Sequence, residues 1–504
     1  MRVLLAGYNI DAHVLKEAED AGISKDRLTP EVLSAAYARI SRDPRSVEEL
    51  RNEALEQVSK ARKSNQRIIF GMGHHSVAEH AVFNFDITGI SRLAIEALEH
   101  FRLCSFTEKS QRYITLDHDF VLPKELKDTK FEHSILALAK DQATLYEKFR
   151  GSLHERLIEK HPKLNAKKSG RTLLEGWAKE DARYVTLLVA TSQLGFTANA
   201  RNLELIARRL AGSPLDEVRF LGRNLYEATL DVAPSLLLFT DPAPFDLETS
   251  GELAALADKL FNAPATYSSD EPSVKLIDYS PDGDQRIAAA MLAASTTRSF
   301  GECNAAVKEL STDKLSEIFY AAMRRMEFFD SPPREFEHVT FTFELIMSSA
   351  CFAQLKRHRM TSQTVRDYDP ALGVTVPPAI IECGFENEFM EHANRTSELH
   401  NSIKAAHGSA ASQYVLTNAH RRRVLLTSNL RELYHFTRLR EDTHAQWDIR
   451  ALAVDMRKAV EKVMPLGTLL LCGKDSFVSK FEKTFGQKPK QDPANPINPA
   501  KLQK

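Results

Sequence analysis

Several clusters of polar residues could do chemistry, and the densest is Gly73-His-His-Ser-Val-Ala-Glu-His80. Its histidines and glutamate invite a zinc interpretation. An inverted zincin places two residues between its first His and the Glu-His pair and needs a helix. Here three residues follow His75, and a strand pattern begins almost at once. A polar turn before a sheet explains the cluster better, so we expect no metal.

A second cluster, Lys356-Arg-His-Arg359, ends a helical pattern in which Met347, Cys351 and Leu355 are four residues apart. Cations in a last turn suit the negative end of the helix dipole, so a charged helix end is one explanation. Planar guanidinium groups beside an imidazole also suit a ligand with phosphates and a polar ring edge. On this cluster alone both explanations remain open.

The segment Ser105–Tyr113 combines hydroxyls, a carboxylate and a guanidinium. Ser110 and Arg112, two residues apart, can both reach one phosphate, the serine with one hydrogen bond and the arginine with a bidentate pair. A solvated loop fits this composition equally well.

A further cluster runs from Asn429 to Asp448, where Arg431, His435 and Arg438 are spaced to share one helix face. Such a face is usually a salt-bridged surface, here with three nearby acidic groups. They are Glu432, Glu441 and Asp442.

Two strands are predicted beside these clusters, because apolar and polar residues alternate over 82–88 and over 339–345. Each follows a Glu-His pair, Glu79-His80 or Glu337-His338. Each precedes a serine that could cap a helix, Ser91 or Ser348.

The same order of landmarks continues on both sides of these strands. The helices end in His100-Phe101-Arg102 and in Arg357-His358-Arg359. Asn199-Ala-Arg201 corresponds to Asn429-Leu-Arg431, and first strands are predicted near Val3 and Val274. We therefore predict two copies of one module: residues 1–240, a linker over 241–272, residues 273–484, and a disordered tail over 485–504.

Composition excludes several classes of protein. The 504 residues carry 67 Lys+Arg against 68 Asp+Glu, a net charge of −1 that argues against a general nucleic-acid binder. No apolar run approaches the ~18 residues of a membrane span, and the start is too soon interrupted for a signal peptide. Five scattered cysteines support no disulfide framework, so we expect a cytoplasmic protein with Cys104 and Cys351 as core fillers.

Taken together, the motifs resemble the flavin-dependent thymidylate synthases. The matching series is Gly-His-x-Ser-x-x-Glu-His, a strand, Ser-Arg, a helix, Arg-His-Arg-x-x-Ser, Asn-x-Arg and Leu-Arg…His-Ala-Gln-Trp. Members are usually single modules that form a homotetramer, with FAD and dUMP sites built where subunits meet. The resemblance implies an α+β fold, each module a mostly antiparallel sheet with packed helices. It also implies methylation of dUMP to dTMP with methylenetetrahydrofolate and NADPH.

The first copy keeps the family's flavin-contacting turn and its nucleotide-phosphate loop. The residues implied to contact the flavin are His74, Ser76, Glu79, Asn199 and Arg201. Those implied to bind the nucleotide are Glu108, Ser110, Arg112 and Arg183. The Arg-His-Arg triplet, however, reads His100-Phe101-Arg102, and the catalytic Arg position is Leu210.

The second copy keeps the complementary set. Gln354 and Arg440 are implied to bind the uracil, with Arg440 as the catalytic residue. Those implied to bind the flavin are Arg357, His358, Arg359, Asn429, Arg431 and His435. The phosphate loop is lost, with Val365, Asp367 and Asp369 at the Glu, Ser and Arg positions, and Gln413 matches Arg183.

This division predicts composite sites shared between modules, in a homodimer that forms a pseudo-tetramer. Two alternatives stay open. A related enzyme could modify the same uracil C5 differently, for example by hydroxymethylation. The chain could also be a flavin- or nucleotide-binding pseudoenzyme, which the altered triplet of the first copy favours and the intact second copy opposes.

Overall fold

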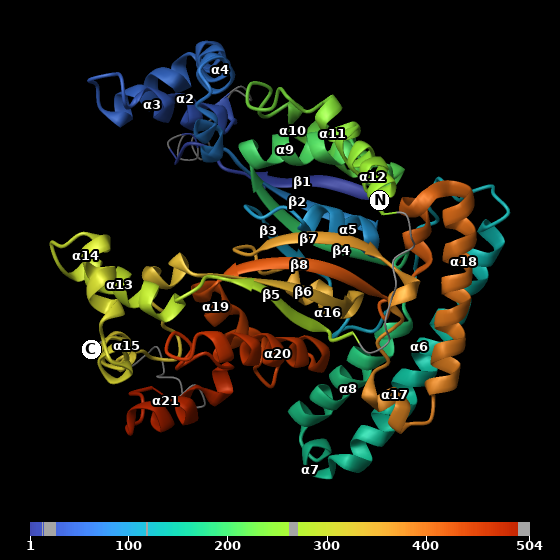
Figure 1. Cartoon of the computed structure of the whole chain (residues 1–504). Helices are drawn as coiled ribbons and strands as arrows, with labels where there is room; N and C mark the ends of the chain where they lie inside the picture. Colours follow the sequence, from blue (N-terminus) through green and yellow to red (C-terminus); the bar gives the residue numbers. More distant parts are fainter. Residues whose placement is uncertain (13, 15–26, 117–118, 262–270, 492–504) are drawn as a thin grey trace. The chain divides into compact units, whose positions relative to one another are not determined.

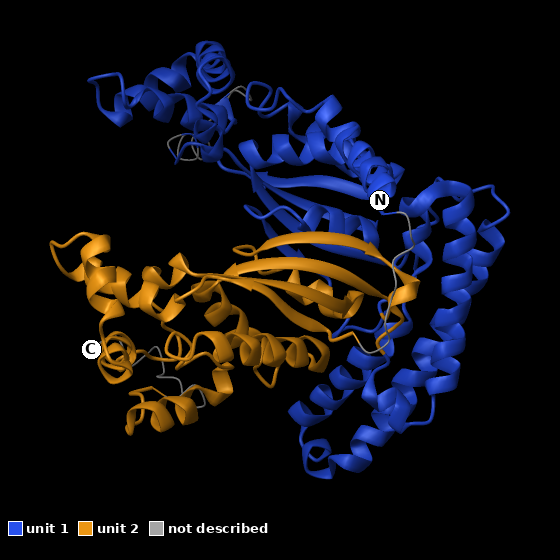
Figure 2. Cartoon of the chain, viewed as in Figure 1, with its two compact units in different colours: residues 1–266, 376–418 blue, residues 267–375, 419–504 orange. Residues whose placement is uncertain are grey.

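The computed structural model describes residues 1–12, 14, 27–116, 119–261 and 271–491. The chain divides into two compact units (Figure 2). Unit 1 contains residues 1–266 and 376–418, and unit 2 contains residues 267–375 and 419–504. Each unit holds one four-stranded sheet.

Unit 1 is an antiparallel sheet with packed helices (Figure 1). Its strands are β1 (Arg2–Tyr8), β2 (Val82–Ser91), β3 (Ser105–Glu108) and β4 (Thr191–Asn199). Its helices before β4 are α2 (Glu31–Arg39), α3 (Val47–Glu56), α4 (Val58–Gln66), η2 (Arg67–Gly71), η3 (His75–His80), α5 (Arg92–Glu99), α6 (Glu132–Lys160), α7 (Pro162–Asn165), α8 (Lys168–Ala182) and η4 (Arg183–Val185). Those after β4 are α9 (Ala200–Ala211), α10 (Asp216–Leu230), α11 (Pro244–Leu247), α12 (Thr249–Leu260), α17 (Pro378–Glu382), α18 (Glu386–Ser412) and η7 (Gln413–Val415).

Unit 2 repeats the plan of the first sheet. Its strands are β5 (Val274–Tyr279), β6 (Thr340–Ser348), β7 (Ser362–Tyr368) and β8 (Arg421–Asn429). Its helices are α13 (Gly283–Ser295), α14 (Phe300–Lys308), α15 (Thr312–Met323), η5 (Arg334–His338), α16 (Ser349–Leu355), η6 (Pro370–Leu372), α19 (Leu430–Arg440), α20 (Trp447–Val463), η8 (Lys474–Ser476) and α21 (Phe477–Phe485).

The two sheets have the same topology, which confirms the predicted α+β fold in two copies. Strand order is β1-β2-β4-β3 in one and β5-β6-β8-β7 in the other, with all neighbours antiparallel. Leu5 pairs with Phe85 and Leu276 pairs with Phe343, and in both ladders a bulge follows directly. Such an irregularity at matching positions identifies the strands as copies of each other.

Alternating side chains explain why these segments form half-buried strands. In β2, Phe83, Phe85 and Ile87 are buried while the residues between them are exposed. The strand carries one residue more than β6, and a second bulge at Gly89, where φ is +65°, accommodates it. The two strands therefore end in register at their capping serines.

Ser91 and Ser348 cap the following helices as predicted, since each hydroxyl accepts a hydrogen bond from the backbone three residues on. The same hydroxyls donate to Glu217 and to Asp448, which tie each cap to α10 or α20. The second helix begins at Ser349, so Met347 lies in β6 and the predicted helical spacing from Met347 is wrong. A cap with its own serine stops the helix from extending backwards.

Residues 376–418 follow β7 in sequence, yet they pack within unit 1. His392 bonds the carbonyl of Val185 at 3.1 Å. Leu188 N donates to the carbonyl of Leu416, and Asn418 N donates to the carbonyl of Thr186. Because 186 and 188 match 416 and 418 in the two copies, this pairing is reciprocal, as at the two-fold interface of a homodimer.

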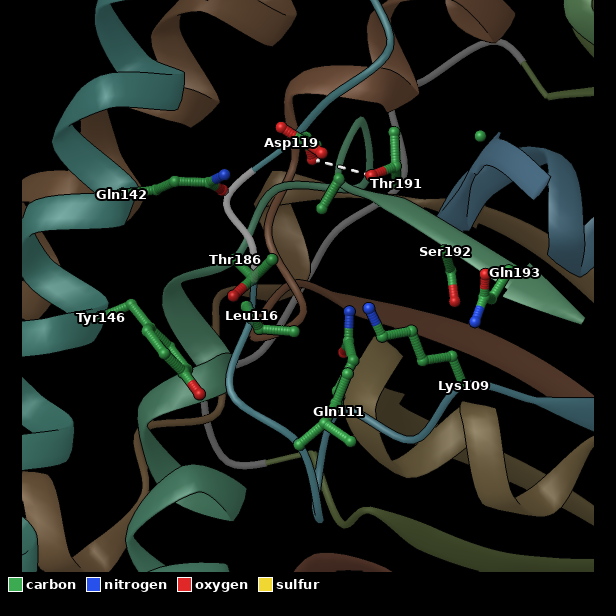
Figure 3. Close-up of a pocket in the computed structure, with 13 residues that line it drawn as sticks. Lys109, Gln111, Leu116, Asp119, Gln142, Tyr146, Thr186, Thr191, Ser192 and Gln193 are labelled. Carbon is green, nitrogen blue, oxygen red and sulfur yellow. Dashed lines mark hydrogen bonds between the residues drawn. The ribbon is translucent and has the colours of Figure 1, made fainter.

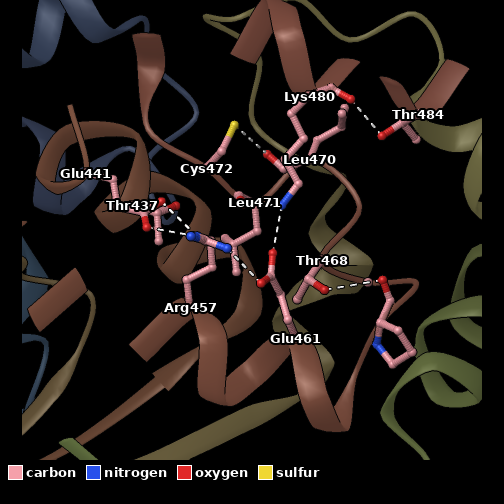
Figure 4. Close-up of polar contacts among 12 residues, drawn as sticks. Thr437, Glu441, Arg457, Glu461, Thr468, Leu470, Leu471, Cys472, Lys480 and Thr484 are labelled. Carbon is pink, nitrogen blue, oxygen red and sulfur yellow. Dashed lines mark hydrogen bonds and ion pairs between the residues drawn. The ribbon is translucent and has the colours of Figure 1, made fainter. Parts of the chain in front are cut away.

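Ion pairs hold the last helices of unit 2 together (Figure 4). Arg457 on α20 binds Glu441 at 2.8 Å and Glu461 at 2.7 Å, and Lys480 on α21 binds Glu461 at 2.7 Å. Helix α21 is thereby linked through α20 to Glu441, the residue that follows Arg440.

Several further predictions can be compared with the structure. Cys104 and Cys351 are buried in the cores of their units, as expected. Part of the predicted linker is helical, in α11 and α12. In the predicted tail, backbone groups of Lys490 and Gln491 bond Glu327, and residues 492–504 lie outside the described part of the chain.

Within the described residues, no helix has both the length and the apolar character to cross a membrane.

Candidate active site

The predicted phosphate loop of the first copy follows β3 and is fixed by ion pairs. Glu108, at the end of β3, pairs with the buried Arg92 and accepts a hydrogen bond from Ser192 at 3.3 Å. The Ser110 hydroxyl accepts a hydrogen bond from Arg112 N at 3.2 Å, which bends the loop. The Arg112 guanidinium contacts Glu180 at 2.5 Å. Glu180, on α8, was not anticipated from the sequence.

Arg183 completes this group from the start of η4, and its environment points to an anion. The side chain is 5% exposed, and its Nε donates to the carbonyl of Glu180 at 3.3 Å. Its Nη2 is buried without a hydrogen-bond partner among the described residues. Burial lowers the pKa of Arg183, Tyr184 and Glu180 oppose this shift, and the nearby Arg112 and Arg92 add to it. A buried guanidinium with an open donor beside a second guanidinium is a suitable receptor for phosphate.

A cavity of about 230 Å³ adjoins the loop (Figure 3). Lys109 and Gln111 line it from the loop, alternating with the phosphate-loop residues, and Gln142 and Tyr146 line it from α6. Burial raises the pKa of Tyr146 to about 12, so its phenol stays protonated and can donate. This cavity could not be predicted from the sequence, because its walls come from distant segments.

In the second copy, arginines occupy the strand positions that line this cavity in the first copy. Thr191, Ser192 and Gln193 are replaced by Arg421–Arg423. The Arg422 guanidinium lies 3.8 Å from the ring centre of Tyr368 and bonds the carbonyl of Arg366. Asp369 accepts a hydrogen bond from Ala371 N and forms a turn. The second copy therefore fills this region with its own side chains.

The flavin turn of the first copy lines another pocket, of about 300 Å³. His74 and Ser76 are joined there by Tyr37, Arg39 and Arg42 at the end of α2, which the sequence analysis missed. A π-helical turn, η2, leads into this pocket, and such turns are frequent at functional sites. Among the described residues Arg42 contacts the sulfur of Met72 and has no carboxylate partner. In the sequence, the signal for these residues is the run Arg39-Ile-Ser-Arg42, which follows an apolar helical pattern.

The Glu-His and Asn-x-Arg motifs are brought together in both units by the same contacts. Glu79 pairs with Arg201 at 2.5 Å, and Glu337 pairs with Arg431 at 3.1 Å. Asn199 and Asn429 cap α9 and α19 with their side-chain oxygens. These residues therefore have a structural task in each copy, whatever ligand they also contact.

The Arg-His-Arg triplet of the second copy directs its side chains in two ways. Arg357 and Arg359 are exposed, whereas His358 is 3% exposed and lies against α19. Arg440 donates from Nε to His358 Nε2 at 2.9 Å and from Nη2 to the carbonyl of Gln354 at 3.1 Å. The triplet is thus both a charged surface and a support for Arg440.

Gln354 presents an open acceptor beside Arg440. Its side-chain nitrogen contacts Gln446 at 3.4 Å, and its Oε1 is buried without a hydrogen-bond partner among the described residues. A ligand N–H would satisfy this oxygen. Of the predicted residues of the second copy, Gln354, His358 and Arg440 therefore meet near the ends of α16 and α19, whereas Asn429 and Arg431 lie at the start of α19. In unit 1, His74 and Ser76 line one pocket, and Glu108, Ser110, Arg112 and Arg183 belong to the segments around the other.

Comparison with known proteins assigns the family. The family described as "Thymidylate synthase complementing protein" matches residues 25–235 and again 275–466. The chain belongs to this family, in a tandem form. The two matched stretches contain all the predicted site residues and the strands of both sheets, except β1 and the first residue of β5.

Relatives of two lengths are similar to this tandem member of the family. A "UPF0159 protein" of Chlamydia muridarum is 25% identical over 81% of this chain and 80% of its own length. A "Flavin-dependent thymidylate synthase" of Clostridium tetani is 29% identical over 42% of this chain and 83% of its own length. A solved structure titled as a UMP/dUMP methylase, PolB from Streptomyces cacaoi, matches 38% of this chain and 92% of that one at 20% identity. Its TM-score of 0.31 is too low to inform the fold or the site.

Proposed function

We propose that the protein is a flavin-dependent enzyme that methylates C5 of dUMP to form dTMP. The names of its single-module relatives support modification of a uracil nucleotide with a flavin. The observation that carries the proposal is the open donor of Arg183, whose Nη2 is buried without a hydrogen-bond partner among the described residues.

In the first module, the nucleotide phosphate binds Ser110, Arg112 and Arg183. Arg112 exchanges its contact with Glu180 for the phosphate or keeps both, and Arg183 gains the partner that its Nη2 lacks. Glu108, held by Arg92, fixes the position of the loop. Charge-assisted hydrogen bonds of this kind are short and strong.

In the second module, Gln354 and Arg440 recognise the uracil edge. The open Oε1 of Gln354 accepts the ring N–H, and the Arg440 guanidinium stabilises negative charge as C5 becomes nucleophilic. No protein nucleophile is needed for this role.

The remaining residues fit a dinucleotide flavin. The exposed Arg357 and Arg359 in unit 2 supply cations for a diphosphate, as does Arg42 in the His74–Ser76 pocket of unit 1, and the exposed His435 supplies ring nitrogens for hydrogen bonds. FAD, when bound, supplies the redox chemistry, with NADPH as reductant and methylenetetrahydrofolate as carbon donor. The other residues proposed to contact it are Glu79, Asn199, Arg201, His358, Asn429 and Arg431.

Each complete site combines the first module's phosphate loop with the second module's Gln354 and Arg440. Asp367 and Asp369 at the loop of the second copy repel a phosphate dianion, and Leu210 in the first copy cannot replace Arg440. We place these composite sites in a homodimer, which corresponds to a tetramer of single modules.

A spectroscopic experiment tests this function. The purified protein is reconstituted with FAD, and bleaching of the flavin by NADPH is followed with and without dUMP. We expect bound flavin, faster bleaching with dUMP, and a product of dTMP mass once methylenetetrahydrofolate is added. A protein that takes up no flavin contradicts the proposal, and a hydroxymethyl product would replace methylation by the related C5 reaction.

A further inference from the structure

A line of buried polar groups in unit 2 ends at Arg440. The Glu432 carboxylate lies 3.4 Å from His358 Nδ1, and His358 Nε2 accepts the Nε–H of Arg440 at 2.9 Å. Glu432 and Arg440 both belong to α19, and His358 reaches them from the end of α16. We call Glu432, His358 and Arg440 the relay.

The relay fixes the protonation of its histidine. Arg440 can only donate, so Nε2 of His358 carries no proton and the neutral ring carries its proton on Nδ1, toward Glu432. Burial lowers the pKa of His358 well below its usual value, and Arg440 and His435 act in the same direction. The imidazole therefore remains neutral at physiological pH and acts as an acceptor for the arginine.

The first copy has lost all members of the relay together. The matching positions are Phe101 for His358, Asn202 for Glu432 and Leu210 for Arg440. Leu210 belongs to the hydrophobic core of unit 1, and the partly buried Phe101 packs against that core. If the imidazole of His358 served only the fold, the first copy would have no reason to lose it together with the arginine. The comparison of the two copies therefore indicates that Glu432, His358 and Arg440 act together.

A metal site is the other arrangement that these side chains suggest. Ligand atoms of His358, Glu432 and His435 lie within 4.8 Å of one another. However, Nε2 of His358 is engaged by a guanidinium and Nδ1 carries the proton, so the ring offers no lone pair to an ion. The nearby positive charge of Arg440 also disfavours a cation.

We propose that Glu432 and His358 are positioning residues that hold the Arg440 guanidinium in its working orientation. His358 anchors Nε, and the carbonyl of Gln354 anchors Nη2. The arginine is thereby fixed on two of its nitrogens before any ligand arrives. This inference rests on the proposed function for the use of Arg440, and it gives His358 a task beyond the flavin contact that the family resemblance implies.

A double-mutant cycle tests the coupling. His358→Phe and Glu432→Asn, which copy the first module, should each lower kcat by about 10- to 100-fold even when FAD is supplied in saturating amount. In an Arg440→Leu background neither change should lower kcat further. His358→Gln, whose amide oxygen can accept from Arg440 while its NH₂ faces Glu432, should restore part of the activity. Phe101→His, at the matching position without an arginine partner, is the control and should leave kcat unchanged.

Two results would overturn the proposal. One is that the effects of the substitutions on kcat are additive in the cycle. The other is that His358→Phe loses activity through loss of bound FAD, whether or not Arg440 is present. A second measurement does not depend on the activity. In ¹⁵N-histidine NMR of the ligand-free protein, His358 should show a neutral ring protonated on Nδ1, and Arg440→Leu should shift its Nε2 resonance. If wild-type protein is inactive but this signature is found, the proposed function fails and the relay stands. A charged or Nε2-protonated ring refutes the relay itself.

Discussion

Replacing Arg183 by methionine should strengthen the ligand-free fold and weaken nucleotide binding. Methionine fills the space of the arginine stem without a charge. In the structure this arginine is buried, its Nη2 lacks a hydrogen-bond partner among the described residues, and its Nε donates a long hydrogen bond of 3.3 Å to the carbonyl of Glu180.

The two effects can be estimated separately. A buried unsatisfied donor costs about 1–3 kcal/mol, and the lost hydrogen bond stabilises by about 0.5–1.5 kcal/mol, so we expect the free energy of unfolding to rise by about 1 kcal/mol. Hydrogen bonds from a guanidinium to a phosphate contribute about 2–3 kcal/mol. Their loss should weaken dUMP binding by about 30- to 150-fold.

Urea unfolding of ligand-free protein and calorimetric titration with dUMP measure these quantities. Gln413→Met, at the matching position of the second copy, is the control and should leave the affinity unchanged. If Arg183→Met destabilises the protein and binds dUMP as tightly as wild type, Arg183 is a structural residue and the reasoning fails.

Three further predictions concern other parts of the molecule. Arg42→Ala should weaken binding of FAD, NADPH or both by about 2- to 5-fold, the size of effect expected for an exposed charge. Fluorescence titration with each dinucleotide shows which one binds the pocket, and unchanged binding of both refutes a role of Arg42 in binding. Burial raises the pKa of the Cys472 thiol to about 11, so iodoacetamide at pH 8 should label it in unfolded but not in native protein, as mass spectrometry can check. Lys480 and Arg457 lower the pKa of Glu461, so the contribution of this carboxylate to stability is present above about pH 4.5 and is lost as the pH falls through the lower pKa of the folded state. The difference in unfolding free energy between wild type and Glu461→Gln should therefore shrink in that pH window. A difference that stays constant with pH would contradict the assignment.

The repeat and its strands could be predicted from the sequence because they depend on local patterns. Alternating apolar residues located β2 and β6, and the serines that follow them cap helices as expected. The order of motifs along the chain was sufficient to align the copies, and the matching bulges after Leu5 and Leu276 agree with that alignment.

Contacts between distant segments could not be predicted in this way. Glu79 and Arg201 belong to two motifs that are far apart in the sequence. Nothing in the spacing of these motifs shows that the sheet brings the two side chains together. Glu432 was assigned to a charged surface, but it is buried beside His358. Helical periodicity places a side chain on a face and does not identify what covers that face.

In the proposed composite site, each module supplies what the other has lost, so that a complete site needs both modules. Calorimetric titration of the FAD-loaded protein with dUMP tests this division. We predict about one dUMP per chain, and no binding after Arg112→Ala, because only the first copy has a phosphate loop. About two dUMP per chain, or unaltered binding by the Arg112→Ala protein, would contradict the account.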